Sequence, residues 1–458
     1  MESTPVASTA AKLAPGPRGE PLVGSLRSFT GNYLGTMVRG FQEYGEIVRY
    51  RVGSRIIHIL SHPDLAYHVL VEHNQEFPKL DQKRGLGAVT GNGLLANSDQ
   101  QSWLRQRRMM QPMFHRKRLA TMADKITAAG ERMLGRWQSL PPGSVVNIAS
   151  EMTRVTLDII TQTMFSTDVM GEAGKLGPAV SVGVRYAQNK VQNPLSLPLR
   201  WPTPLNRAFK ESLRTLDAVI YPMIRERRAA GTSRGDLLDM LIEARDVDTG
   251  EAMSDQQVRN EVLTIFVAGH DTTANALAWT WYTLSQHPEI VARVQAEVDA
   301  VLQGRVPTMD DLPQLPYVQQ VFNEVLRFSP PLPQVGPRRV LADTTLRGYH
   351  IPAGSRLIVS IYNIHHHPDF WPEPTVFDPE RWTPARSAAQ HRLAFMPFGA
   401  GPRLCIGNNL ALMEAQLLMA LVAQRYELRL LPGHRVEREV AIVMRPRNGL
   451  PMTLHPRR

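Results

Sequence analysis

The chain has almost no cysteine, because Cys405 is the only one among its 458 residues. A lone cysteine excludes an intrachain disulfide, and it excludes an iron–sulfur cluster held by several cysteines of this chain. The chain also lacks the run of about 18 to 20 apolar residues that a membrane span needs. Its first ten residues have neither a basic start nor a hydrophobic core, so they do not read as a signal peptide or an anchor. We therefore expect a soluble, cytoplasmic protein.

Lysine is scarce as well. Only eight of the 52 basic residues are lysine, and none follows Lys210. The net charge of +10 therefore reflects a bias toward arginine more than a designed basic patch. A basic surface can attract an acidic protein, an anionic membrane or nucleic acid. Because the chain carries no nucleic-acid-binding motif, we expect an acidic protein as the partner of such a surface.

Cys405 lies in a glycine-rich run from Phe398 to Gly407, Phe-Gly-Ala-Gly-Pro-Arg-Leu-Cys-Ile-Gly. The glycines allow the backbone to curl so that N–H groups point at the sulfur. An amphipathic helix is predicted from Asn408 onward, which places Cys405 at a helix N-terminus, where a thiolate is stabilised. A lone cysteine is usually an inert, buried hydrophobe, but this context favours a thiolate ligand.

This run resembles the haem-binding loop of the cytochrome P450 family, Phe-Gly-x-Gly-x-Arg-x-Cys-x-Gly, with every fixed position present. The resemblance implies that Cys405 is the metal ligand, holding the iron of haem b, with Gly407 beside it in the cofactor-binding loop. It also implies that Phe398 packs on the proximal side of the haem. Arg403 would bind a haem propionate, for which a planar guanidinium is well suited.

A second motif, Ala268 to Thr273, lies within a helical pattern that runs from about Asp255 to Gln286. Gly269 costs a helix interior about 1 kcal/mol relative to alanine, so its presence needs a reason. One reason is a local distortion of the helix at a working site. The alternative is a helix break that Asp271 or Thr272 caps.

The motif matches the family's distal helix, Ala-Gly-x-Asp/Glu-Thr-Thr. By that resemblance, Gly269 leaves room for O2, Thr272 hydrogen-bonds the bound peroxide, and Asp271 relays protons; these three are the predicted catalytic residues. Ala268 would contact both haem and substrate. His270, at a variable position, is interpreted as a bystander rather than a haem ligand.

Glu324 and Arg327 form an i, i+3 pair on a predicted helix, which by itself indicates an ordinary surface ion pair. Together with the later Pro379-Glu380-Arg381-Trp382, the pair resembles the family's Glu-x-x-Arg and Pro-Glu-Arg-Phe motifs, with Trp382 in place of the usual Phe. The implied triad of Glu324, Arg327 and Arg381 is structural rather than catalytic.

Further haem contacts come from basic residues. Trp103 and Arg107 resemble the family's Trp-x-x-x-Arg motif, and their spacing of four places both on one helix face. The family also places a propionate-binding residue ten positions before a glycine that matches Gly348. That offset selects Arg338, with Arg339 left open as a rival.

The coarse pattern indicates a mainly α fold with small β-sheets, and the family fold is a triangular helical prism. A hairpin is predicted from Glu46–Gly53 and Arg55–Leu60. Residues 1–20 are expected to be an extended, proline-rich leader, followed by one cytochrome P450 catalytic domain over residues 21–458.

The resemblance implies a haem-thiolate monooxygenase that inserts one atom of O2 into an apolar substrate by hydroxylation or epoxidation. Two electrons would come from separate proteins, a ferredoxin with its reductase or a flavodoxin-type donor, docking near Arg403 and the Trp103 helix. We expect a monomer. A peroxygenase, a haem-thiolate isomerase or dehydratase, and a haem sensor are alternatives, and each would normally lack the Asp271-Thr272 pair.

The substrate remains open among fatty acids, terpenoids, steroids and macrolide-like compounds. The residues implied to line its pocket are mainly apolar, as expected for such ligands; they are Phe266, Ala268, Val335 and Val443.

Overall fold

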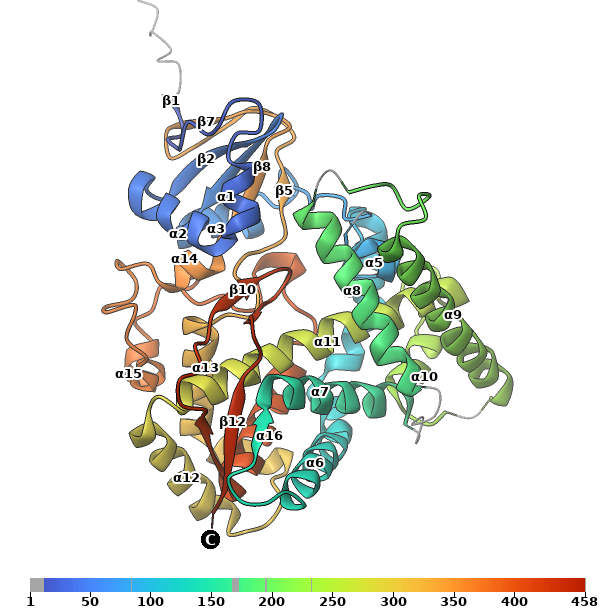
Figure 1. Cartoon of the computed structure of the whole chain (residues 1–458). Coiled ribbons are helices and arrows are strands. Elements are labelled where there is room, and N and C mark those ends of the chain that lie inside the picture. Colours follow the sequence, from blue (N-terminus) through green and yellow to red (C-terminus); the bar gives the residue numbers. More distant parts are fainter. Residues whose placement is uncertain (1–11, 84, 167–172, 194–195, 232, 458) are drawn as a thin grey trace, which may run out of the picture. The chain divides into compact units, whose positions relative to one another are not determined.

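The computed structural model describes residues 12–83, 85–166, 173–193, 196–231 and 233–457. It divides into two compact units, which we call the small unit and the large unit and describe separately. The small unit comprises Met1–Leu80, Pro333–Pro374 and Gln390–Leu404, and the large unit comprises Asp81–Leu332, Thr375–Ala389 and Cys405–Arg458. Helices and small sheets make up both units (Figure 1), which confirms the predicted fold class.

The small unit contains two sheets, one with strand order β2-β3-β8-β5 and one with order β1-β7-β6. Its elements, in chain order, are β1 (Lys12–Leu13), α1 (Leu26–Gly31), α2 (Tyr33–Tyr44), β2 (Ile47–Val52), β3 (Arg55–Leu60), α3 (Pro63–Tyr67), the π-helix η1 (His68–Glu72), β5 (Arg338–Arg339), β6 (Thr344–Leu346), β7 (Tyr349–Ile351), β8 (Arg356–Val359), α14 (Ile361–His365) and the 3-10 turn η6 (Gly401–Arg403).

The predicted hairpin is confirmed in this unit. Strands β2 and β3 pair antiparallel from Ile47 opposite Leu60 to Val52 opposite Arg55. Gly53, at the turn, has φ of +60°, a left-handed conformation that glycine adopts without a steric cost. The hairpin is extended by the parallel pairing of β3 with β8.

The described part of the proline-rich leader is tied to this unit. Strand β1 pairs in parallel with β7, and the Arg49 N–H donates to the Pro15 carbonyl at 2.8 Å. A methyl group on Gly16 would lie 1.9 Å from the Arg49 carbonyl oxygen, so this approach requires glycine. The leader is thus an extended, fixed segment from Lys12 onward, and residues 1–11 lie outside the described residues.

The large unit is mainly helical. Its elements are α4 (Gly87–Thr90), α5 (Gln100–Met110), η2 (Gln111–Phe114), α6 (Arg116–Gln138), β4 (Val145–Asn147), α7 (Ile148–Phe165), η3 (Ala173–Lys175), α8 (Leu176–Gln192), α9 (Pro204–Ala230), α10 (Leu237–Glu243), α11 (Asp255–Leu284), α12 (Pro288–Leu302), η4 (Met309–Gln314), α13 (Pro316–Phe328), η5 (Pro379–Trp382), α15 (Pro384–Ser387), α16 (Asn408–Arg425), β9 (Tyr426–Leu430), β10 (Arg438–Val440), β11 (Met444–Pro446) and β12 (Pro451–Pro456).

Helix α11 is the central helix of the large unit and contacts α7, α9, α13 and α16 (Figure 1). Ser254 caps its start by accepting a hydrogen bond from the Gln257 N–H at 3.2 Å. Because neighbours surround it, most of its residues are buried, including the polar Arg259, Asn260 and Glu261 near its start.

Helix α16 differs from its prediction. Its sequence reads as amphipathic, but every residue from Met413 to Ala423 is buried. The reason is that α16 packs against α6, α12, α13 and α11, so no face of this stretch meets solvent.

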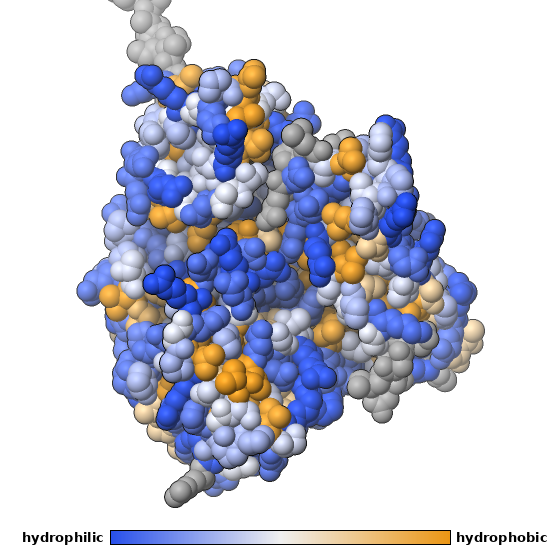
Figure 2. Space-filling model, in the orientation of Figure 1, coloured by the Kyte–Doolittle hydropathy of each residue, from blue (hydrophilic) through white to orange (hydrophobic). Residues whose placement is uncertain are grey.

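None of the described helices combines the length and the apolar character of a membrane span. On the face drawn in Figure 2, hydrophilic side chains predominate and hydrophobic ones form small groups between them.

Candidate active site

Cys405 lies directly before helix α16, as predicted, with Gly407 as the residue that precedes the first helical turn. The cysteine keeps solvent-accessible surface. Desolvation by the surrounding protein raises the pKa of its thiol, whereas the hydrogen bond from the Gly407 N–H and the nearby charge of Arg107 lower it. The sulfur is therefore largely desolvated but still accessible, and two groups of this chain stabilise its thiolate form.

Helix α5 supplies that charge. Asp99 caps the helix by accepting from the Ser102 N–H at 2.8 Å, and Trp103, one turn before Arg107, is buried. Burial lowers the pKa of Arg107, and the interaction with Cys405 raises it. The structure thus brings Arg107 and Cys405 together within the large unit, as the two separate motifs predicted.

Three cations gather in the small unit: Lys79, Arg338 and Arg403. Lys79 and Arg338 form an isolated β-bridge. Desolvation lowers the pKa of Arg338 to about 10, and desolvation followed by repulsion from Arg338 lowers that of Arg403 to about 10. The pKa of Lys79 falls to about 7, through desolvation and then repulsion from Arg403 and Arg338.

Arg338 is the buried member of the pair that the sequence left open, and Arg339 is exposed. The Arg338 Nε is buried and has no hydrogen-bond partner among the described residues. A buried guanidinium nitrogen without a partner is costly. The geometry therefore favours Arg338 over Arg339 as the anion-binding residue.

These residues fit a haem. The cations of the small unit match the carboxylates of propionate groups, and the accessible thiol of Cys405 suits an iron ligand. Phe398 is half-buried and precedes Arg403 and Cys405 in the same loop, and its packing on the haem remains a prediction. Lys79 belongs to no motif noted in the sequence, so its place beside the two arginines was missed.

The distal motif lies in an unbroken part of α11, which excludes the alternative in which Asp271 or Thr272 caps a helix end. The Thr272 hydroxyl donates to the Ala268 carbonyl at 2.7 Å. Since its proton is held there, the hydroxyl oxygen can accept a further hydrogen bond. The Asn275 side-chain amide donates to the Asp271 Oδ1 at 3.1 Å and fixes that carboxylate nearby.

Gly269 and His270 lie where helix α11 contacts helix α7. A methyl group at Gly269 would lie 3.2 Å from Ile160 Cδ1, so the glycine allows the two helices to approach closely. The His270 ring nitrogen Nδ1 bonds the Phe266 carbonyl at 2.7 Å, and the His270 carbonyl accepts from the Thr156 hydroxyl at 3.0 Å. This packing explains the glycine locally, while the predicted space for O2 remains untested.

The predicted pocket residues are apolar, and Phe266 and Val443 are buried whereas Ala268 and Val335 are partly buried. The Phe266 ring lies 5.8 Å from the ring of Phe165 on α7, and Val443 is 3% exposed. Val335, in the small unit, donates its N–H to the Val359 carbonyl at 2.9 Å. Their roles toward a substrate stay predictions.

The predicted triad is assembled inside the large unit. Glu324 and Arg327 are fully buried, and the Glu324 carboxylate accepts from Arg327 Nη2 at 2.8 Å and from Arg327 Nε at 2.9 Å. Arg381 Nε lies 3.4 Å from Glu324 Oε1. The indole N–H of Trp382 donates to Glu324 Oε2 at 3.0 Å, and the Asp378 N–H donates to Oε1 at 3.0 Å.

Several buried acids were not predicted, and Glu261 is one of them. Glu261 on α11 is fully buried, and it accepts hydrogen bonds from the Leu94 N–H at 2.9 Å and from the Gln257 side chain. Burial raises its pKa to about 7 against the opposing effect of these bonds. It thereby ties the segment around Leu94 to the central helix.

Comparison with known proteins identifies relatives along the whole chain. The family model described as Cytochrome P450 matches residues 14–451. Cyclooctatin synthase of Streptomyces melanosporofaciens is 34% identical, over 97% of this chain and 94% of that protein. Pentalenene oxygenase of Streptomyces avermitilis is 33% identical, over 91% and 89%.

Solved structures agree with these relatives. The crystal structure of the cytochrome P450DA heme domain superposes with a TM-score of 0.89 at 27% identity, covering 98% of both chains. The retinoic acid-bound cyanobacterial CYP120A1 does so with a TM-score of 0.86 at 25% identity, covering 98% of this chain and 100% of that one.

Proposed function

Since this chain belongs to the cytochrome P450 family, and is thus a haem-dependent P450 monooxygenase, we propose that it oxygenates an apolar terpenoid with electrons from a separate ferredoxin. The proposal for the substrate class rests on the relatives whose names carry cyclic hydrocarbon skeletons, pentalenene and cyclooctat-9-en-7-ol. Terpenoids are one of the classes that the apolar residues predicted for the pocket allow.

When bound, the haem would supply the activation of O2, with Cys405 as the iron ligand and Arg338, Arg403, Trp103 and Arg107 as the cofactor-binding residues. Lys79 joins this set because it shares the buried site of Arg338 and Arg403. The Gly407 N–H and the charge of Arg107 favour the thiolate, against the desolvation that raises the pKa of the thiol. A thiolate ligand favours O–O cleavage in this family.

On the distal side, Thr272 holds a proton at a defined place. Its hydroxyl donates to the Ala268 carbonyl, which leaves the oxygen free to accept a hydrogen bond from a protonated reacting group and to hold that proton in place. Asp271, whose carboxylate accepts from the Asn275 amide one turn further along, can take up a proton from solvent and pass it on within the same turn. The adjacent acid and alcohol are the observation that favours a monooxygenase over a peroxygenase, an isomerase or dehydratase, or a haem sensor, because these alternatives need no such proton delivery.

The electron donor is proposed to bind at the start of α6 rather than along α5. Two arginines of α5 are already paired, Arg105 with Asp246 at 3.0 Å and Arg108 with Asp248 at 2.9 Å. Residues 116–118 at the start of α6, Arg-Lys-Arg, are exposed. A cluster of exposed cations attracts an acidic partner and speeds its association.

The absorption spectrum of the reduced protein with carbon monoxide tests the iron ligand. We expect a strongly red-shifted Soret band, and loss of that shift in Cys405→Ser. An unshifted band in the unaltered protein would overturn the assignment of Cys405.

Turnover with a ferredoxin, its reductase and 18O2 tests the substrate class and the donor site. We expect a terpene such as pentalenene to gain one 18O atom, whereas fatty acids and steroids of similar size stay unchanged. Lys117→Glu should raise the ferredoxin concentration needed for half-maximal rate, and the control Arg214→Glu on α9 should not. Oxygenation of a fatty acid in place of the terpene would refute the substrate class.

A further inference from the structure

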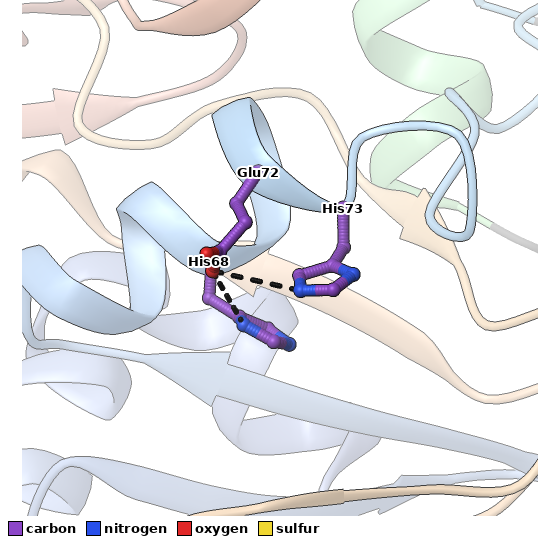
Figure 3. A group of neighbouring side chains, drawn as sticks. All are labelled: His68, Glu72 and His73. Carbon is purple, nitrogen blue, oxygen red and sulfur yellow. Dashed lines mark hydrogen bonds and ion pairs between the residues drawn. The ribbon is translucent and has the colours of Figure 1, made fainter.

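Two histidines and a glutamate converge on the π-helix η1 of the small unit (Figure 3). His68 Nδ1 lies 3.3 Å from Glu72 Oε2, and His73 Nε2 lies 3.5 Å from the same oxygen. One ligand atom from each of the three residues lies within 4.8 Å of the others. All three side chains retain access to solvent, at 33%, 52% and 36% exposure for His68, Glu72 and His73.

The π-helical turn is what brings these side chains together. The His73 N–H donates to the His68 carbonyl at 2.9 Å, which is the i to i+5 bond of a π-helix. In an α-helix, with 3.6 residues per turn, a residue five positions on would point about 140° away. The wider turn instead places His73 above His68, with ring centroids 4.2 Å apart. Such turns occur often at functional sites.

A fourth residue orients His73. Its Nδ1 lies 2.8 Å from Glu76 Oε1, so the proton belongs on Nδ1 and the Nε2 lone pair is left facing Glu72. A carboxylate that holds the far nitrogen of a ligating histidine is the usual outer partner in metal sites. His68 is placed by its ring contact with the buried Phe77, at 6.1 Å between centroids.

We propose that His68, Glu72 and His73 bind one divalent transition-metal ion of the zinc, cobalt or nickel kind, with water as the remaining ligand. Imidazole and carboxylate suit such ions, and a set of two histidines and one glutamate with an open position is a known zinc arrangement. Ligands about 2.1 Å from a tetrahedral ion are about 3.4 Å apart, which matches the two measured separations of 3.3 Å and 3.5 Å.

A second group in the small unit, Glu46, His367 and Asp369, shows by contrast why η1 is chosen. There the Arg347 guanidinium already bonds Glu46, so a cation of the chain itself occupies the carboxylate. At η1 the carboxylates of Glu72 and Glu76 instead contact the imidazoles of His68 and His73.

The metal-binding turn packs against the loop that leads to Cys405. A methyl group at Gly401 would lie 1.9 Å from the Leu70 carbonyl oxygen and 3.4 Å from Val71 Cα, so η6 rests directly on η1. An ion that stiffens η1 therefore also stiffens the support of Gly401, four residues before Cys405.

Isothermal titration of the chelator-treated, haem-bound protein with ZnCl2 tests the site, using a protein without a histidine tag. We expect one zinc ion per chain, and an affinity lowered at least tenfold in His68→Gln and in His73→Gln. Glu76→Gln acts on His73 alone and should lower the affinity about 10- to 100-fold. His115→Gln, at an exposed histidine before α6, is the control and should leave the affinity unchanged.

Zinc binding that persists at full affinity in both His68→Gln and His73→Gln would overturn the proposal, as would the absence of binding to the unaltered protein. If Glu46→Gln loses zinc binding while His73→Gln keeps it, the ion belongs to the cluster of Glu46, His367 and Asp369, and the proposal is refuted. Far-UV circular dichroism of each variant distinguishes a lost ligand from a lost fold. The carbon monoxide spectrum is independent of these outcomes, so the zinc site can fail while the haem assignment stands.

Discussion

Replacing Trp382 by phenylalanine tests how the buried Glu324 is held. The indole N–H donates to Glu324 Oε2 at 3.0 Å, and phenylalanine keeps the ring but removes this donor. Glu324 is fully buried, so water cannot replace the lost bond. Trp382→Phe is therefore expected to destabilise the large unit although the family's own motif has Phe at this position.

The expected loss is about 2 kcal/mol. A hydrogen bond to a charged group contributes about 1.5–3 kcal/mol, and leaving a buried charge wholly without partners costs more. Here Arg327 and the Asp378 N–H still bond the carboxylate, which favours the lower half of that range. The smaller ring also buries less apolar surface, which adds less than about 1 kcal/mol to the loss of stability.

Urea unfolding followed by far-UV circular dichroism, with the haem bound, measures this difference. The control is Trp201→Phe, because the Trp201 side chain is half exposed and the same atoms are removed; we expect a change under about 0.5 kcal/mol there. If Trp382→Phe loses no more than the control, the indole bond does not stabilise Glu324 and the reasoning is refuted.

Three further results are expected. In Thr272→Ala more of the consumed O2 should appear as hydrogen peroxide, measured as peroxide per substrate oxidised, whereas Thr280→Ala, which removes a similar bond to a carbonyl of α11 at 2.9 Å, should not alter this ratio. Glu261 has a folded-state pKa of about 7 against an ordinary 4.5, so stability falls as pH rises through that window; Glu261→Gln should gain up to about 3 kcal/mol in urea unfolding at pH 8 and almost nothing at pH 4.5. Gly401→Ala should lower the melting temperature far more than Gly399→Ala, since both glycines have positive φ but only the first meets backbone.

The elements that the sequence predicted are those whose signal is local. The hairpin was predicted from alternating residues around Gly53, and the central helix from a helical pattern between about Asp255 and Gln286; the structure has both. The partners within the triad could also be expected, because Glu324 and Arg327 share one helix and Arg381 stands in a recognisable motif.

Features that depend on packing between distant segments could not be predicted from local sequence patterns. Helix α16 looks amphipathic but is buried on all sides between Met413 and Ala423, because four helices surround it. The role of Trp382 as a donor also depends on a carboxylate 58 positions away in the chain. Likewise, the π-helical turn at His68 changes which side chains share a face, and no periodicity in the sequence marks it.

The cations of the small unit show why a cofactor site is only partly visible in sequence. Arg403 and Arg338 were found through motifs, whereas Lys79 follows a Phe-Pro pair with no pattern of its own and is placed beside Arg338 by a β-bridge. Each of the three has its pKa lowered by burial, and repulsion lowers two of them further, so their grouping opposes folding. Carboxylates that bind there would relieve this repulsion and so stabilise the folded state. On the proposed assignment of these residues to the haem propionates, the cofactor completes the charge balance of the small unit, a property that arises only when distant segments meet.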